Sequence, residues 1–245
     1  PGSPVGPACM TAFACYDLTD VTAFGYDVVS NRPKVAAYRA PGAPISTFAV
    51  ESAVDELAQK LAMDPGEMRL INAAKDETKA AYGPTLKNIG FVETLEAAVA
   101  SQHYTSALGE APKGKRRGRG LASGFWFNIG GESSGATYVN EDGTVTVVSG
   151  NPDIGGSRAS MGMMAAEVLG IEVGRVRTIV GDTASVGYSF LTGGSRVTFA
   201  TGMAVTQSAE NVRDDLCRRA ALIWEIDVDA VEWRDGHAHP AGENA

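Results

Sequence analysis

Apolar residues recur at helical spacing in five stretches of the chain, and each stretch predicts a helix with one buried face. The stretches begin near residue 46, begin at residue 65, cover 91–100, cover 161–169 and run from about 205 to 220. Asp64-Pro65-Gly66-Glu67 marks the start of the second helix, because aspartate caps free N–H groups and proline suits the first helical position. Gly170 is expected to end the fourth helix.

Short apolar runs predict the strands. Extended segments are expected over 21–29, 35–38 and 120–127. A hairpin is expected from 136–139 and 144–149, joined by the turn Glu141-Asp142-Gly143, and a further strand over 176–180. The second half thus reads strand, hairpin, helix, strand, helix. This order predicts an α+β fold, with mixed β-sheets that carry their helices on one face.

The basic stretch Lys113-Gly114-Lys115-Arg116-Arg117-Gly118-Arg119 places five cations within seven residues. Charge and glycine together favour a solvated linker. It would separate a first sub-domain, residues 1–112, from a second, residues 120–245. Most exposed charge runs bind nothing specific, so contact with a phosphate or a partner is the alternative interpretation.

Composition and charge exclude several classes of protein. The net charge of −8 argues against nucleic acid binding, which needs a dominant basic face. No apolar run approaches the roughly 20 residues that span a bilayer, and no signal peptide is evident, so no membrane contact is expected. Three cysteines without metal or iron–sulfur spacing favour reduced thiols in the cytoplasm. His237-Ala238-His239 is expected in a solvated tail. The first residue, Pro1, indicates a processed or truncated chain.

Two glycine-rich turns share the sequence Gly-Gly-Ser-Arg, and a helix is expected after each. They are Gly150-Asn151-Pro152-Asp153-Ile154-Gly155-Gly156-Ser157-Arg158 and Leu191-Thr192-Gly193-Gly194-Ser195-Arg196-Val197-Thr198. Glycine lets a ligand approach the backbone, and a helix N-terminus offers N–H groups with partial positive charge. Hydroxyl groups and arginine add further donors. The pair predicts a site that holds a phosphate-bearing cofactor from two sides. The alternative is two tight strand-to-helix connections.

Three blocks carry a likeness to a known family. The first runs from Val35-Ala36-Ala37-Tyr38-Arg39-Ala40-Pro41-Gly42-Ala43-Pro44 to Met63-Asp64-Pro65. The second joins Asp153-Ile154-Gly155-Gly156-Ser157-Arg158 to Ala166-Glu167-Val168-Leu169-Gly170-Ile171, and the third runs from Gly181-Asp182-Thr183 to Thr198. In this order they resemble the large, molybdenum-cofactor-binding subunit of the xanthine dehydrogenase / aldehyde oxidase / carbon monoxide dehydrogenase family.

The resemblance implies a role for each block. Residues of the first block would border the molybdenum and the substrate pocket, namely Arg39, Ala40 and Gly42. Residues of the other two would bind the pyranopterin and its phosphates, namely Gly155, Gly156, Ser157, Arg158, Gly193, Gly194, Ser195, Arg196 and Thr198. Without the resemblance, Arg39 is interpreted as a surface arginine after a strand.

The chain also departs from the family pattern. Many members have Gly-Gln-Gly at the first cofactor turn, whereas Gly155-Gly156-Ser157 lacks the glutamine. Ala40-Pro41-Gly42 offers no thiol, which argues against copper-dependent carbon monoxide chemistry. The family's general base is a glutamate in a Gly-Glu segment near the subunit's C-terminus, and the resemblance implies that the chain ends before this segment. Gly109-Glu110 and Gly131-Glu132 have the dipeptide but lie in the wrong order, and Gly66-Glu67 belongs to a helix start. No catalytic residue and no metal ligand are therefore assigned in this chain.

The resemblance thus implies an internal portion of a molybdenum hydroxylase. The whole enzyme would oxidise a C–H bond of an aldehyde or N-heterocycle with oxygen from water. Its cofactor would be a molybdopterin with molybdenum, in the cytosine dinucleotide form for a bacterial protein. Electrons would leave through iron–sulfur and FAD subunits or domains, since neither group is expected in this chain. The alternative is a non-catalytic pterin- or phosphate-binding or assembly module, and the isolated chain is expected to be inactive.

Overall fold

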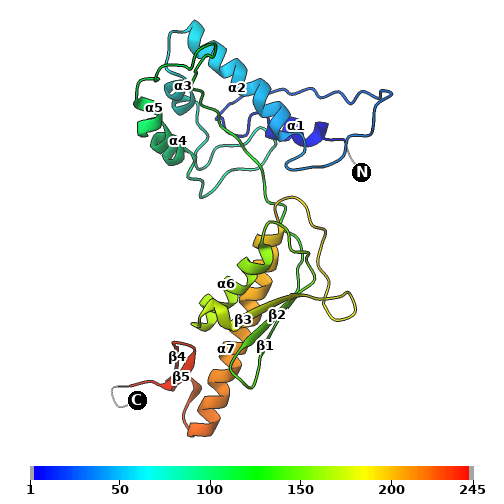
Figure 1. Cartoon of the computed structure of the whole chain (residues 1–245), viewed down its shortest axis with the longest axis vertical. Coiled ribbons are helices and arrows are strands. Elements are labelled where there is room, and N and C mark those ends of the chain that lie inside the picture. The colour runs from blue at the N-terminus through cyan, green and yellow to red at the C-terminus, as the bar shows by residue number, and fades with distance from the viewer. Residues whose placement is uncertain (1–2, 243–245) are drawn as a thin grey trace. The chain divides into compact units, whose positions relative to one another are not determined.

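The computed structural model describes residues 3–242, and its contacts divide the chain into two compact units, Pro1–Trp126 and Phe127–Ala245 (Figure 1). We call them unit 1 and unit 2. The division falls after the basic stretch 113–119, because the residues that follow this stretch pack on unit 1. The backbone N–H of Ser123 donates to Glu51 Oε2 at 2.7 Å, and the ring of Phe125 lies 5.7 Å from that of Tyr82.

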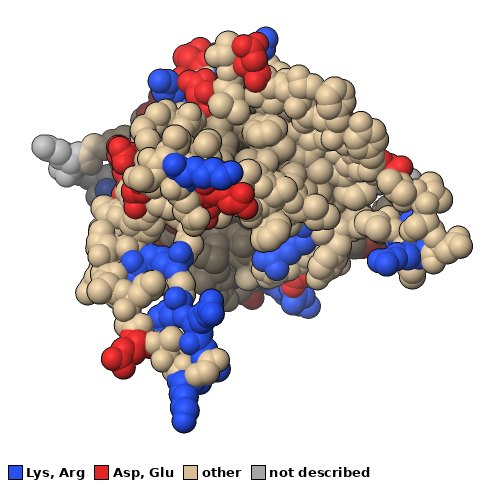
Figure 2. Space-filling model, turned by 90° about the horizontal axis from the view of Figure 1, so that it is seen from above, with Lys and Arg blue, Asp and Glu red and all other residues tan. Residues whose placement is uncertain are grey.

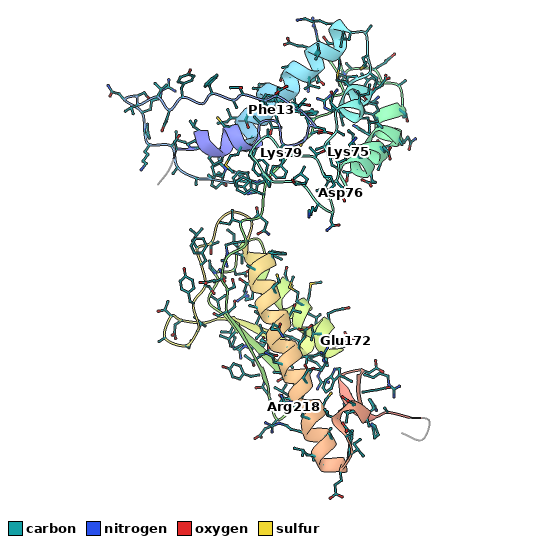
Figure 3. All side chains as sticks on the ribbon, turned by 180° about the vertical axis from the view of Figure 1, so that it is seen from behind. Phe13, Lys75, Asp76, Lys79, Glu172 and Arg218 are labelled. Atoms are coloured by element: carbon teal, nitrogen blue, oxygen red, sulfur yellow. The ribbon has the colours of Figure 1, made fainter. Side chains whose placement is uncertain are left out.

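Unit 1 is built from helices joined by long irregular segments. The helices are α1 (Val5–Thr11), α2 (Ala43–Lys60), α3 (Pro65–Ile71), α4 (Phe91–Ala100) and α5 (Gln102–Thr105). The predicted start of α3 is confirmed, because Asp64 Oδ1 accepts from the N–H groups of Gly66 at 2.7 Å and Glu67 at 3.1 Å. The predicted extent of α4 is confirmed as well. Figure 3 shows Lys75, Asp76 and Lys79 along the loop that follows α3.

The strands predicted over 21–29, 35–38 and 120–127 are wrong: the structure has no strand in these segments. A strand needs a neighbour to satisfy its backbone N–H and C=O groups, and none of the described residues pairs with these segments. The large apolar side chains of the first two segments are correspondingly exposed, as at Val29 (97 %) and Tyr38 (88 %), whereas those of 120–127 are half-buried. On the face shown in Figure 2, uncharged residues cover most of the surface and charged ones form small separate groups.

The interior of unit 1 is organised by a buried ion pair. Arg69 of α3 is fully buried, and its Nε lies 2.8 Å from Glu51 Oε2 of α2. Its Nη1 lies 2.8 Å from Asp55, and the Tyr16 hydroxyl donates to Glu51 Oε1. Together with the Ser123 N–H, these contacts tie three distant parts of the sequence to the Glu51 carboxylate. The predicted apolar face of α2 is only partly buried, since Leu57 and Leu61 remain exposed.

Burial and the Glu51 charge also act on neighbouring groups that can ionise. Burial, and then the nearby charge of Glu51, raise the pKa of Cys15 to about 11. Burial and the hydrogen bond to Glu51 raise the pKa of Tyr16. Both groups are therefore protonated at neutral pH, and the Cys15 thiol is a poor nucleophile.

Unit 2 contains a mixed three-stranded sheet with the order β1-β2-β3. The strands are β1 (Gly135–Val139), β2 (Val145–Ser149) and β3 (Val176–Val180); β1 and β2 form the predicted antiparallel hairpin, and β2 and β3 are parallel. Helix α6 (Ser157–Leu169) makes the crossover from β2 to β3, and α7 (Gly202–Trp224) packs beside it. The expected α+β class, with helices on one face of a mixed sheet, is confirmed.

The core of unit 2 lies between this sheet and the two helices. It consists of apolar side chains from β2, α6 and α7, namely Val145, Val147, Met161, Ala165, Leu169, Val205 and Ala209. Gly170 ends α6 in the left-handed conformation with φ +64°, as its position predicts. No helix of residues 3–242 is both long and apolar enough to cross a membrane.

The remaining elements of unit 2 are short. They are η1 (Val173–Arg175), the π-helical turn η2 (Val197–Thr201), η3 (Val228–Ala230), and the hairpin of β4 (Val231–Arg234) with β5 (His237–Pro240). The predicted solvated tail at His237 is therefore wrong, because these residues pair with β4. Trp233 anchors the hairpin by donating its indole N–H to the carbonyl of Leu169 at 2.9 Å.

We predict that Glu51→Gln destabilises unit 1 by about 3 kcal/mol, because it leaves the buried Arg69 without its main counter-charge. Urea denaturation with amide exchange of α2 and α3 as the probe measures this loss for unit 1 by itself. Glu56→Gln, on the exposed side of the same helix, should change stability by less than about 0.5 kcal/mol. Equal losses in the two variants would contradict the prediction.

Candidate cofactor-binding site

The parallel pair of strands carries both glycine-rich turns to one edge of the sheet. The first turn follows the C-terminal end of β2 and leads into α6. The second follows the loop after β3 and leads into η2 and α7. At this edge Gly181, just beyond β3, donates its N–H to the carbonyl of Ser149 in β2 at 2.9 Å. The N-terminal ends of α6 and α7 consequently lie at the same end of unit 2 (Figure 1), an arrangement that suits ligand binding beyond the strand ends.

The first turn exposes its backbone. Gly155 and Gly156 are exposed and left-handed, with φ +62° and +81°, and a Cβ built on either would meet no atom within 4 Å. Ser157 is buried, and its hydroxyl accepts from the N–H of Ile154 at 3.1 Å. Asp153 accepts from the backbone N–H of Arg158 at 3.0 Å and pairs with its guanidinium at 3.4 Å. The two glycines therefore leave their backbone open to solvent, while Ser157 holds the shape of the turn.

The second turn is packed more closely. Gly194 has φ +69°, and a Cβ there would come within 2.5 Å of the Ile129 side chain, so no larger residue fits without a shift. The Gly194 carbonyl accepts from the Ile129 N–H at 3.1 Å, and the Ser195 carbonyl accepts from the Asn128 side chain at 3.0 Å. Ser195 and Thr198 are exposed and line one groove of about 630 Å³, together with Met164, Phe199, Gly202, Met203, Thr206, Gln207 and Glu210.

Arg196 points inward from the second turn and is fully buried. Its guanidinium makes six contacts of 2.5–3.2 Å, five of them with backbone carbonyls. The acceptors are the carbonyls of Gly130, Gly131, Glu132, Phe190 and Leu191 and the hydroxyl of Ser133. Its donors are thus taken up by this chain's own backbone, so any effect of Arg196 on a ligand acts through the loop it holds and through its charge.

A buried chain of hydrogen bonds connects the two turns. Thr201, at the end of η2, donates to Asn151 Oδ1 of the first turn at 2.7 Å. Its oxygen lies 3.1 Å from the hydroxyl of Ser133, which accepts from Arg196 Nη2 at 2.6 Å. Asn151 belongs to the first predicted turn, whereas Ser133 and Thr201 lie outside both predicted turns. The one available signal was the run Gly130-Gly131-Glu132-Ser133-Ser134, another stretch of small polar residues.

Arg196 is one of few cations in unit 2, in which acidic residues predominate. Residues 127–245 contain eight arginines, no lysine and sixteen Asp and Glu. None of the ion pairs found among the described residues involves Arg196. The groups around its guanidinium are backbone carbonyls, the Ser133 hydroxyl and the Phe190 ring, whose centroid lies 5.7 Å away. The exposed cations of α7 lie in its C-terminal half, where Arg218 pairs with Asp215 at 3.4 Å (Figure 3). Within residues 3–242, no group of three or more His, Cys, Asp and Glu is placed to hold a metal ion.

The first block of the family likeness lies in unit 1, at the turn before α2. Arg39 and Ala40 both have positive φ, +47° and +53°, which is uncommon for residues other than glycine and marks a strained turn. Gly42 follows with φ +93°, and a Cβ there would come within 2.2 Å of the Pro4 carbonyl. The turn is thus fixed by close packing against α1, and it presents the Arg39 side chain to solvent.

Comparison with known proteins places this geometry in context. Two models of the family described as the molybdopterin cofactor-binding domain match the chain, one over residues 94–245 and the other over 2–73. The nicotine 6-hydroxylase large subunit of Paenarthrobacter nicotinovorans is 27% identical over 96% of this chain and 31% of its own length. The xanthine dehydrogenase molybdenum-binding subunit of Escherichia coli O157:H7 is 32% identical over 79% of this chain and 27% of its own length.

Solved structures have the same fold. Quinoline 2-oxidoreductase from Pseudomonas putida 86 superposes with a TM-score of 0.78 at 24% identity, covering 98% of this chain and 33% of that one. Aldehyde oxidoreductase from Desulfovibrio desulfuricans ATCC 27774 superposes with a TM-score of 0.70 at 25% identity, covering 97% and 29%. The chain therefore spans about a third of the length of the proteins that it matches.

We predict that Arg196→Lys destabilises unit 2 by about 3 kcal/mol, because an ammonium group cannot replace the planar fork and leaves buried carbonyls without donors. Urea denaturation, followed by amide exchange in β2 and α6, measures the change. Arg158→Lys is the matched control, since the Arg158 side chain is 56% exposed, and it should have little effect. A stable Arg196→Lys variant would show that the carbonyl contacts do not hold the loop.

Proposed function

The chain belongs to the molybdopterin cofactor-binding family of the xanthine dehydrogenase and aldehyde oxidase type, and on this premise we propose that it forms part of the large subunit of a molybdenum hydroxylase. The observation that carries the proposal is the pair of glycine-rich turns at one edge of the sheet of unit 2. One turn presents open glycine backbone, and the other presents hydroxyl groups over a groove. Together they offer donors to an anionic organic group from two sides.

The residues present fit a pterin with phosphate groups. The backbone of Gly155 and Gly156 would approach the cofactor without steric hindrance, since no side chain covers it. Ser195 and Thr198 would donate hydroxyl hydrogen bonds, and Gly193 and Gly194 would let the second turn pack closely on Leu191 and Ile129 so that these hydroxyl groups are held in place. Arg158 would add an exposed cation at the first turn, where it is already positioned by Asp153. Arg196 would lend its buried positive charge, which matters in a unit rich in carboxylates.

When bound, molybdopterin would supply the two-electron redox chemistry of the metal. This chain's residues bind and orient the cofactor, and the Arg39-Ala40-Pro41-Gly42 turn of unit 1 would border the metal and the substrate. No residue of the chain is proposed as the general base.

For the whole protein, we propose oxidation of a C–H bond in an aldehyde or an N-heterocycle, with oxygen from water. Nicotine, xanthine and quinoline appear in the names of the similar proteins, which favours the N-heterocycle. Iron–sulfur and FAD subunits or domains would accept the electrons. We propose the cytosine dinucleotide form of the cofactor. Free thiols at Cys9, Cys15 and Cys217 support a reducing, cytoplasmic location.

A second candidate function is a non-catalytic pterin-binding or assembly module. Both functions require the same pterin contacts. They differ in turnover, which the whole protein would have under the first proposal and would lack under the second.

We predict that Gly156→Asp lowers the pterin bound per chain at least about tenfold, because a carboxylate at the open first turn repels phosphate. Gly156→Asn is the matched control, since asparagine has nearly the same size, tolerates left-handed φ and caps a helix equally well. It should retain most of the pterin. Protein purified from a host that makes the cofactor is assayed for molybdenum and for oxidised, fluorescent pterin.

Three outcomes are informative. Loss in Gly156→Asp alone supports an anionic ligand at the first turn. Equal retention in both variants contradicts this placement of the cofactor. Wild-type chain without molybdenum or pterin, from a host whose other molybdoenzymes are loaded, contradicts cofactor binding itself.

A further inference from the structure

The buried chain of hydrogen bonds in unit 2 has a fixed direction. Arginine has donors only, so Arg196 donates to Ser133 and leaves the Ser133 proton available for Thr201. Thr201 then donates its own proton to Asn151. Each of the two hydroxyl groups accepts one hydrogen bond and donates one, and such a chain polarises each member in turn. Its direction is set by the buried positive charge at one end.

The four members come from three segments of the chain. Ser133 precedes β1, Asn151 follows β2, and Arg196 and Thr201 stand just before and at the end of η2. Asn151, Arg196 and Thr201 are buried, and Thr201 is 0% exposed. A hydroxyl without a partner at such a depth is costly, so the chain restricts how far its segments can move apart.

The local geometry of η2 places Thr201 in this chain. Residues Val197–Thr201 form a π-helical turn, which is rare and occurs often at functional sites. The turn begins directly after Arg196 and ends at Thr201. The short segment 196–201 therefore carries both the Arg196 guanidinium, at one end of the hydrogen-bonded chain, and the Thr201 hydroxyl, which contacts the first turn.

We propose that Thr201 is a positioning residue that sets the spacing between the two glycine-rich turns, and that pterin retention depends on its hydroxyl. The proposal rests on the proposed function as far as the pterin is concerned. Through Asn151, Thr201 fixes the start of the first turn. Through Ser133 and Arg196, it fixes the second. The contacts of the Thr201 hydroxyl thus connect the start of the first turn with the loop that Arg196 holds.

The test compares Thr201→Val, which keeps the shape but removes the hydroxyl, with Thr201→Ser, which keeps the hydroxyl. In the full chain, Thr201→Val should lower retained pterin about tenfold, and Thr201→Ser should stay within about twofold of wild type. Without cofactor, amide exchange of 153–158 and 193–198 should be about tenfold faster in Thr201→Val. Exchange in β2 and the centre of α6 should be unchanged.

Thr137→Val is the matched control. It breaks another hydroxyl pair of unit 2, that between Thr137 of β1 and Ser208 of α7 at 2.6 Å, which does not belong to the chain of hydrogen bonds. It should leave both turns and pterin retention as in wild type. If Thr201→Val fails to fold, Ser133→Ala replaces it, because it interrupts the same chain while keeping the bond between Thr201 and Asn151. Ser133→Ala should then speed exchange in 193–198 more than in 153–158.

Two results would overturn the proposal. One is wild-type exchange and pterin retention in Thr201→Val. The other is an increase in exchange spread evenly over unit 2, which would make Thr201 a general stabilising residue. If wild-type chain binds no pterin, the proposed function fails, and the exchange of the two turns still decides whether Thr201 couples them.

Discussion

A single buried guanidinium determines the arrangement of the candidate site. Arg196 is fully enclosed and is satisfied by five backbone carbonyls and one hydroxyl, with no carboxylate among the described residues paired to it. A carbonyl can satisfy such a donor only if the backbone that carries it is held in place, so the segments around 130–133 and 190–191 are fixed together. The glycine-rich turn from which Arg196 comes is fixed with them.

Unit 1 also contains a fully buried arginine, but its partners are carboxylates. Its buried Arg69 is neutralised by Glu51 and Asp55, so that unit gains order without a net interior charge. Arg196 has no carboxylate partner among the described residues. In a unit whose acidic residues outnumber its arginines two to one, a buried cation in the second glycine-rich turn is a local source of positive potential. This difference is consistent with a structural role for Arg69 and with a role near an anionic ligand for Arg196.

The two turns contribute unlike features. The first offers bare backbone at Gly155 and Gly156, while the second offers hydroxyl groups at Ser195 and Thr198 beside a groove lined partly by Met164 and Phe199. A phosphate-bearing heterocycle needs both, since its anionic part prefers N–H and hydroxyl donors and its rings prefer apolar contact. The topology supplies this combination, because parallel β2 and β3 end at the same edge of the sheet.

The sequence by itself determined the elements that depend on local chemistry. The cap at Asp64, the hairpin turn at Glu141-Asp142-Gly143 and the stop at Gly170 each follow from a few adjacent residues, and the structure confirms them. The family likeness and the two glycine-rich turns could also be recognised in the sequence, because short motifs carry them. Predictions were wrong where a residue needs a distant partner. Residues 21–38 have strand-like composition, but no strand pairs with them. His237 was expected in a solvated tail, but it pairs with β4.

Only the tertiary structure decided that Arg196 points inward and that Ser133, Asn151 and Thr201 meet. The physical reason is that hydrogen bonds between residues 50 or more positions apart depend on the packing of the sheet and helices, which no local pattern records.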